Sequence, residues 1–150
     1  MALRQAQAAL PQAGATGAAL RAGLAYWAIV FTAAFAMGTV RTLWLAPRIG
    51  PTAAVLCELP LMLAVSWLTA RILLNRHPLP RARDRAIMGL TAFAVLMLAE
   101  CVLAVFLFGQ TAGQWAAALV TMPGPLGLAG QLGFAAMPLV VGLYPSAETA

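Results

Sequence analysis

Three ionisable side chains lie within long apolar stretches of this sequence, at similar distances from predicted turns. Arg41 precedes a Pro- and Gly-rich turn near Ile49 by eight residues, and Glu58 follows it by nine. Glu100 lies nine residues before Gly109, where the third apolar stretch ends. At a helical rise of roughly 1.5 Å per residue, each charge lies about 12–14 Å from its turn. Because charges are costly in lipid, we interpret the three as an intramembrane charge cluster.

One cation and two acids at one level leave two interpretations open. If Arg41 pairs with Glu58 across a hairpin, Glu100 has no obvious cationic partner. A carboxyl that gains and loses a proton near a fixed arginine is what a proton-coupled carrier uses. The interpretation we favour is that an ion pair and a neutral glutamic acid fix the register of the helices and move nothing.

The two cysteines stand next to the two acids, which raises the question of a metal site. Cys57 precedes Glu58, and Cys101 follows Glu100. Consecutive helical residues point about 100° apart, so a cysteine and its neighbour cannot both face one ion squarely. We therefore expect no metal and no cofactor. A disulfide between the cysteines is conceivable at matched depth, but small apolar packing is the favoured use.

Prolines and glycines mark expected breaks and contacts. Pro60 removes the donor to the Leu56 carbonyl, and we expect a helix break or kink there. Pro123 and Pro125, in MPGPLG at 122–127, predict a second break, either a plain loop or a discontinuous transporter helix. The third-residue spacing of small residues predicts close helix packing by Gly127, Gly130 and Gly133.

The elements that carry these residues must be membrane spans. Of the 150 residues, 63% are hydrophobic and 9% charged, against about 25% charged in soluble domains. This composition excludes a soluble globule and a disordered chain. We predict an all-α polytopic membrane protein with four transmembrane helices in two antiparallel hairpins. The expected segments are a tail over 1–21, spans at 22–46, 52–71, 86–108 and 126–144 within a domain over 22–147, a basic loop over 71–85, and an interfacial segment over 109–125, with 114–122 interfacial or re-entrant.

Orientation follows from the basic loop. All nine basic residues are arginine, and five of them lie in 71–85. Under the positive-inside rule this loop is cytoplasmic, and so are both termini. The same rule explains the net charge of +5 without nucleic acid, which we do not expect as a partner. Aromatic belts then place Tyr26, Trp27, Trp67 and Tyr144 at the inner interface and Trp44 and Trp115 at the outer one.

Two sequence segments resemble small, uncharacterised inner-membrane proteins of proteobacteria. These segments are GTVRTLWLAPRIG at 38–50, with an arginine near the end of the first span, and CELPLMLAVSW at 57–67, with E-x-P in the second. The resemblance implies a multi-pass protein of the bacterial inner membrane and carries no activity.

Enzyme motifs such as GxSxG, HExxH and the Walker sequence are missing, so we do not expect an enzyme. We expect a packing or partner-binding component, accessory or assembly in kind, that contacts the bilayer and either a second copy or another membrane protein. The alternative is a small oligomeric proton- or ion-coupled transporter or channel that uses the two glutamates.

Overall fold

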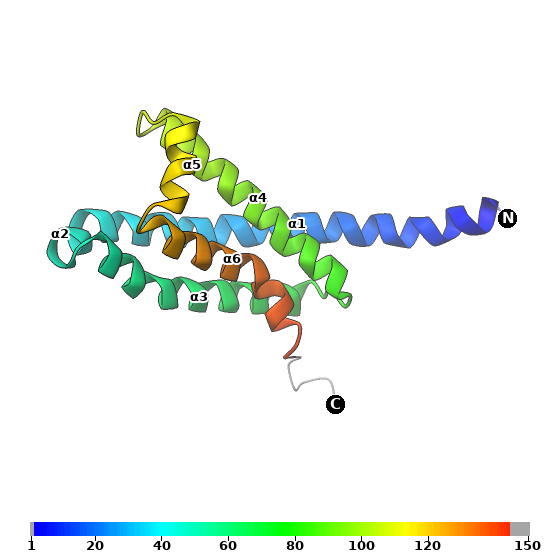
Figure 1. The fold of residues 1–150 in the computed structure, drawn as a ribbon. Coiled ribbons are helices and arrows are strands. Elements are labelled where there is room, and N and C mark those ends of the chain that lie inside the picture. Colours follow the sequence, from blue (N-terminus) through cyan, green and yellow to red (C-terminus); the bar gives the residue numbers. More distant parts are fainter. Residues whose placement is uncertain (1, 145–150) are drawn as a thin grey trace.

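A computed structural model describes residues 2–144, with side chains from residue 14 onward. This part of the chain is entirely helical apart from its turns (Figure 1). Its elements are α1 (Ala2–Val40), the π-helical turn η1 (Arg41–Leu45), α2 (Ala46–Ile49), α3 (Pro51–Arg76), α4 (Ala82–Phe106), α5 (Ala112–Val120) and α6 (Gly124–Val141).

Four of these helical segments are long and apolar enough to cross a membrane, which confirms the predicted all-α fold class. They cover Gly14–Ile49, Pro51–Arg76, Ala82–Phe106 and Gly124–Val141. A spanning helix needs about 20 apolar residues for a hydrocarbon layer of roughly 30 Å. The shortest, α6, has 18 residues, which is within the usual range for a span.

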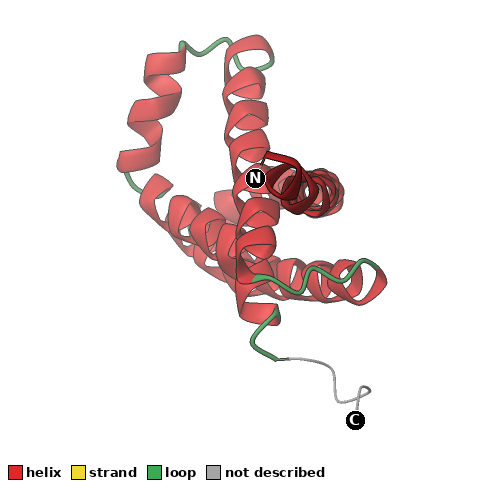
Figure 2. Ribbon diagram, turned by 90° about the vertical axis from the view of Figure 1, so that its right-hand side faces the viewer, coloured by secondary structure: helices red, strands yellow, loops and turns green. Residues whose placement is uncertain are grey.

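The four long helices pack in a ring in the order α1, α4, α6, α3. Helix α3 turns back along α1, while α4 crosses them obliquely and α6 closes the ring between α4 and α3 (Figures 1 and 2). The two expected hairpins are therefore present, but the second is interrupted by α5. We call the end of the bundle with the 77–81 loop the basic end, and the end with Gly50 the hairpin end.

The first helix extends upstream through most of the expected tail. Helix α1 begins at Ala2 rather than near residue 22, and Ala19 is already buried in the core. Ala and Gln are strong helix formers, so the Ala/Gln-rich segment continues the span instead of leaving it. The basic loop is also shorter than expected, because α3 runs to Arg76 and α4 begins at Ala82.

The first turn forms where the prolines and glycine predicted it. Gly50 has φ +86°, a conformation that favours glycine, and Pro51 opens α3. Just before the turn, the backbone N–H of Ala46 donates to the Arg41 carbonyl, five residues back. Pro47 accounts for this wider π-turn, since its ring displaces the carbonyl of the residue four positions before it.

The three prolines that marked expected breaks or kinks stand in different places in the helices. Helix α3 runs unbroken through Pro60, as membrane helices tolerate proline where neighbours compensate. Pro125 lies in the first turn of α6, where the missing N–H has no partner to lose. Only Pro123 stands at a break, as the N-cap of α6.

The expected interfacial segment contains the short helix α5. Thr111 and Gln114 form a capping box at its start, with the Gln114 backbone N–H donating to Thr111 Oγ1 at 3.2 Å. Helix α5 folds back from the end of α4 and leads into α6 (Figure 2). Consequently α6 begins part-way along the bundle rather than at the level of Gly50 (Figure 1).

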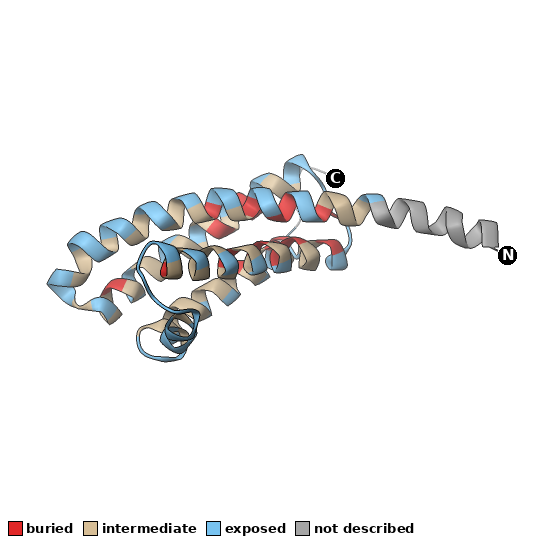
Figure 3. Cartoon of the chain, turned by 90° about the horizontal axis from the view of Figure 1, so that it is seen from above, coloured by how far each residue is buried: buried red, intermediate tan, exposed pale blue. Residues whose placement is uncertain are grey.

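The buried core lies toward the basic end. Its largest fully buried side chains are Tyr26, Met88, Pro138 and Ser66. Burial follows the inward faces of the helices and thins toward the hairpin end, where most residues are exposed (Figure 3). The predicted charged residues Arg41 and Glu58 therefore lie outside the main core.

Candidate intramembrane polar site

Arg41 and Glu58 form an ion pair between the π-turn and α3. Arg41 Nε contacts Glu58 Oε2, as their equal spacing from the turn predicted. The side chains remain 30% and 16% exposed, respectively. The pair therefore joins the two arms of the first hairpin without being enclosed by them.

The ion pair lies between two hollows on opposite sides of the hairpin. On the outer side is an apolar groove of about 310 Å³, which we call the α1–α3 groove; besides the pair it is lined by Ala36, Met37, Val40, Leu45, Cys57 and Leu61. On the inner side is a smaller cavity of about 160 Å³ that faces α6 and is lined by Val55, Leu59, Met62, Gly127 and Gly130.

Glu100 has a partner that sequence reasoning missed. The side-chain amide of Gln131 donates to both carboxylate oxygens of Glu100, at 2.7 Å to Oε1 and 2.9 Å to Oε2. The bond joins α4 to α6. A signal was present, because Gln131 is the one amide side chain in the fourth span, and such groups hydrogen-bond across membrane helices.

The three predicted charges thus form two couples rather than one cluster. Glu100 lines a cavity of about 90 Å³ that shares Met62 and Gly130 with the inner cavity beside Glu58. Among the described residues the only ion pair is Arg41–Glu58. Glu58 and Glu100 therefore line two neighbouring cavities that meet at Met62 and Gly130. Glu100 forms its hydrogen bonds with the amide of Gln131 and not with Arg41.

A third polar contact spans the ring diagonally from α1 to α6. The Tyr26 hydroxyl donates to the Phe134 carbonyl at 3.0 Å, and the two rings stack with centroids 4.6 Å apart. Pro138 has no N–H to give that carbonyl, which lies four residues before it. Tyr26, which was expected in an aromatic belt, is packed inside the bundle, with an exposed fraction of 0%. The backbone carbonyl freed by Pro138 explains why a buried tyrosine fits there.

Two of the three predicted packing glycines receive leucines from α3. A Cβ at Gly130 would collide with Leu59 Cδ2, and one at Gly133 would lie 2.8 Å from Leu63 Cδ2. Gly127 has open space where its Cβ would stand.

Two further glycines, which spacing did not single out, lie against the backbone of a neighbouring helix. A Cβ at Gly89 would collide with the Ala135 carbonyl of α6, and one at Gly23 would lie 2.7 Å from the Met88 carbonyl of α4. Helix α4 therefore packs closely against both α1 and α6, at positions where a glycine leaves room for the other helix.

Both cysteines are free thiols. Cys57 is exposed in the α1–α3 groove, and Cys101 is partly buried on α4. The described residues hold no group of three His, Cys, Asp or Glu side chains that could bind a metal ion.

Comparison of the chain with protein-family models, curated proteins and solved structures gave no match.

Proposed function

We propose that this chain is a non-enzymatic multi-pass membrane protein that acts as an accessory or assembly component. The partner would be a second copy of the chain or another membrane protein, bound at the α1–α3 groove. The observation that carries this proposal is the position of the Arg41–Glu58 pair at the floor of a groove on the outside of the bundle.

An exposed ion pair in the hydrocarbon layer needs a polar neighbour. Charged residues within membrane spans almost always face a bundle interior or a water-filled cavity. Here the pair borders the α1–α3 groove, whose other lining residues are apolar or a thiol. A partner helix with one hydroxyl or amide at this level would cover the pair and bury the surrounding apolar surface.

The internal couples support a packing role for the rest of the polar residues. Arg41–Glu58 joins the first two spans, Glu100–Gln131 joins the last two, and Tyr26 bridges the ring diagonally. Each contact joins one pair of helices. Together the three contacts keep the shape of the groove constant. Polar contacts of this kind contribute about 0.6 kcal/mol each on average in membrane bundles.

Cross-linking through Cys57 tests the proposal in the bilayer. With Cys101→Ser as background, mild oxidation of membranes should link two copies through Cys57 if a second copy occupies the groove. If another protein occupies it, Cys57 should be protected from a membrane-permeant maleimide in native membranes and reactive after purification. Equal reactivity in both, without a dimer, contradicts the proposal.

The cavities on the inner side of the pair favour a second candidate, a proton- or ion-coupled transporter. The spaces beside Glu58 and Glu100 adjoin at Met62 and Gly130, so a side-chain movement of Met62 would connect two carboxyls. A flux that Glu100→Gln abolishes while the protein stays folded would favour transport.

For location, we propose the bacterial inner membrane, with the basic loop and both termini cytoplasmic. The arginines of the basic end and the resemblance in residues 38–67 support this orientation. Alkaline phosphatase fusions after residue 50 should be active, and those after residue 79 inactive.

A further inference from the structure

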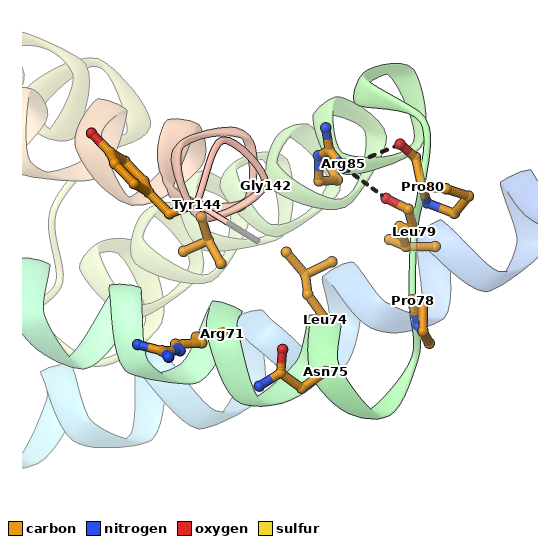
Figure 4. Close-up of a pocket in the computed structure, with 10 residues that line it drawn as sticks. Arg71, Leu74, Asn75, Pro78, Leu79, Pro80, Arg85, Gly142 and Tyr144 are labelled. Atoms are coloured by element: carbon orange, nitrogen blue, oxygen red, sulfur yellow. Dashed lines mark hydrogen bonds between the residues drawn. The ribbon is translucent and has the colours of Figure 1, made fainter. Parts of the chain in front are cut away.

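A separate cavity of about 330 Å³ opens at the basic end, and none of its lining residues belongs to the polar couples. It lies between the last turns of α3, the 78–80 loop, the start of α4 and the end of α6 (Figure 4). Arg71 and Asn75 line it from α3, and Arg85 lines it from α4. Its volume is within the range of small-ligand sites, roughly 300–1,000 Å³.

The cavity is positively charged. Arg71 and Arg85 line it, and none of its lining residues is acidic. The nearest acid along the chain, Asp84, is buried and lines a different hollow with Arg81 and Arg83. A site with this charge balance attracts an anion.

The fold holds Arg85 in place. Its Nη1 donates to the carbonyls of Leu79 at 3.0 Å and Pro80 at 3.2 Å (Figure 4). Gly142 makes room for the guanidinium, because a Cβ there would collide with it. Arg71, by contrast, is exposed and lies over the Trp67 ring, 5.0 Å from its centroid. One cation is therefore fixed in the wall, and the other is accessible at the rim.

Apolar side chains complete the lining. Leu74, Leu79 and Val141 border the same space as the arginines. Helices α3 and α6 end beside it, so a bilayer crossed by these candidate spans would have its surface at the level of the cavity. A soluble anion would use the arginines but not the apolar wall. A phospholipid uses both, through its phosphate and its glycerol and first acyl carbons.

We propose that this cavity binds the headgroup of an anionic phospholipid. Its phosphate would lie between Arg71 and Arg85, with the glycerol against Leu74 and Val141. Basic pockets between membrane helices on the cytoplasmic side bind such headgroups, and this step rests on the orientation proposed above.

The test is thermal unfolding of the full-length chain in a neutral maltoside detergent, titrated with phosphatidylglycerol, phosphatidylcholine or inorganic phosphate. We expect phosphatidylglycerol alone to raise the melting temperature in a saturable way. Arg71→Gln should weaken its apparent affinity about fivefold, the factor for losing about 1 kcal/mol per basic residue. Arg71→Lys should retain affinity within about twofold.

Arg48→Gln is the matched control, because Arg48 also lies over a tryptophan, 4.3 Å from the Trp44 centroid, but at the hairpin end. It should leave the titration unchanged. Equal effects of phosphatidylglycerol and phosphatidylcholine, or of Arg71→Gln and Arg48→Gln, would overturn the proposal. The same shift with inorganic phosphate at equal concentration would overturn the lipid assignment in favour of a soluble anion. If a variant does not fold, the three titrations of the unmodified chain, with phosphatidylglycerol, phosphatidylcholine and inorganic phosphate, still test the proposal.

Discussion

The hydroxyl of Tyr26 supplies the hydrogen bond that Pro138 withholds from the carbonyl of Phe134. The two residues lie on helices that face each other across the ring, so one bond compensates a local defect in α6 and also ties α1 to it. Because it has both roles, we expect the Tyr26 hydroxyl to contribute more to the stability of the bundle than an ordinary interhelical hydrogen bond.

Removing that hydroxyl should destabilise the bundle only while Pro138 is present. Tyr26→Phe leaves the Phe134 carbonyl without a donor, and we expect a loss of about 0.6–1.7 kcal/mol. Pro138→Ala restores a backbone N–H for the same carbonyl, so Tyr26→Phe should cost much less in that background. Equilibrium unfolding of the four proteins in mixed micelles measures the difference. An identical cost in both backgrounds would show that the two residues act independently.

The ion pair should behave as a unit. Arg41→Gln or Glu58→Gln alone leaves one charge of a partly exposed pair without its partner, and we expect a loss of about 1–3 kcal/mol, between the values for exposed and for buried pairs. Exchanging the two charges (Arg41→Glu with Glu58→Arg) should recover most of it. Thermal unfolding of the purified variants measures this, with Arg21→Gln, at an exposed position on α1, as a control expected within about 0.5 kcal/mol of the unmodified chain. No recovery in the exchanged protein would count against the contact.

The Glu100–Gln131 couple separates the two candidate functions. Glu100→Gln keeps a group that can accept a hydrogen bond from Gln131, whereas Gln131→Leu leaves the carboxyl of Glu100 without its donor. For an assembly component, we expect Gln131→Leu to destabilise the fold and Glu100→Gln to preserve it, with no flux in either. Ion flux in proteoliposomes and unfolding in detergent should be measured on the same preparations. A pH-dependent flux that disappears in folded Glu100→Gln protein would favour the transporter.

Glycine substitutions should separate close helix contacts from open positions. Gly89→Val places side-chain atoms against the Ala135 carbonyl, and overpacking of this kind costs typically about 1–3 kcal/mol. Gly127→Ala meets nothing within contact distance and should be close to neutral. The melting temperatures of the two variants in one detergent provide the comparison. If Gly127→Ala lowers stability as much as Gly89→Val, the packing described here for α4 and α6 is wrong.

The spans could be predicted because their signal is local. Runs of apolar residues bounded by prolines, glycines and arginines fix their number and order, and nearly equal spacing from the turn near Ile49 placed Arg41 opposite Glu58. The start of α1 was predicted less accurately. The Ala-rich segment before residue 22 is less apolar than the span, but its residues still favour a helix, so α1 begins at Ala2.

The partners of Glu100 and Tyr26 could not be predicted, because they depend on how each helix is rotated and on the ring order. Nothing in the spacing of Glu100 states that its hydrogen-bond partner lies on α6 rather than on the first hairpin. The sequence did carry clues: Gln131 is a lone amide in an apolar span, and Pro138 must leave the Phe134 carbonyl without its usual donor. Those clues identify groups that need a partner, but they do not identify the partner.

The π-turn at Arg41–Leu45 makes the first hairpin tolerant of a one-residue deletion in that segment. A turn with bonds five residues apart accommodates one residue more than an α-helical turn does, so it is equivalent to a single-residue insertion. Deleting one residue between Thr42 and Leu45 would therefore return the segment to regular α-helix while Arg41 keeps its direction toward Glu58. The same deletion between Thr52 and Cys57, in the regular part of α3, has no wider turn to absorb it and would rotate everything before it by about 100° relative to Glu58, although no charged residue had been replaced.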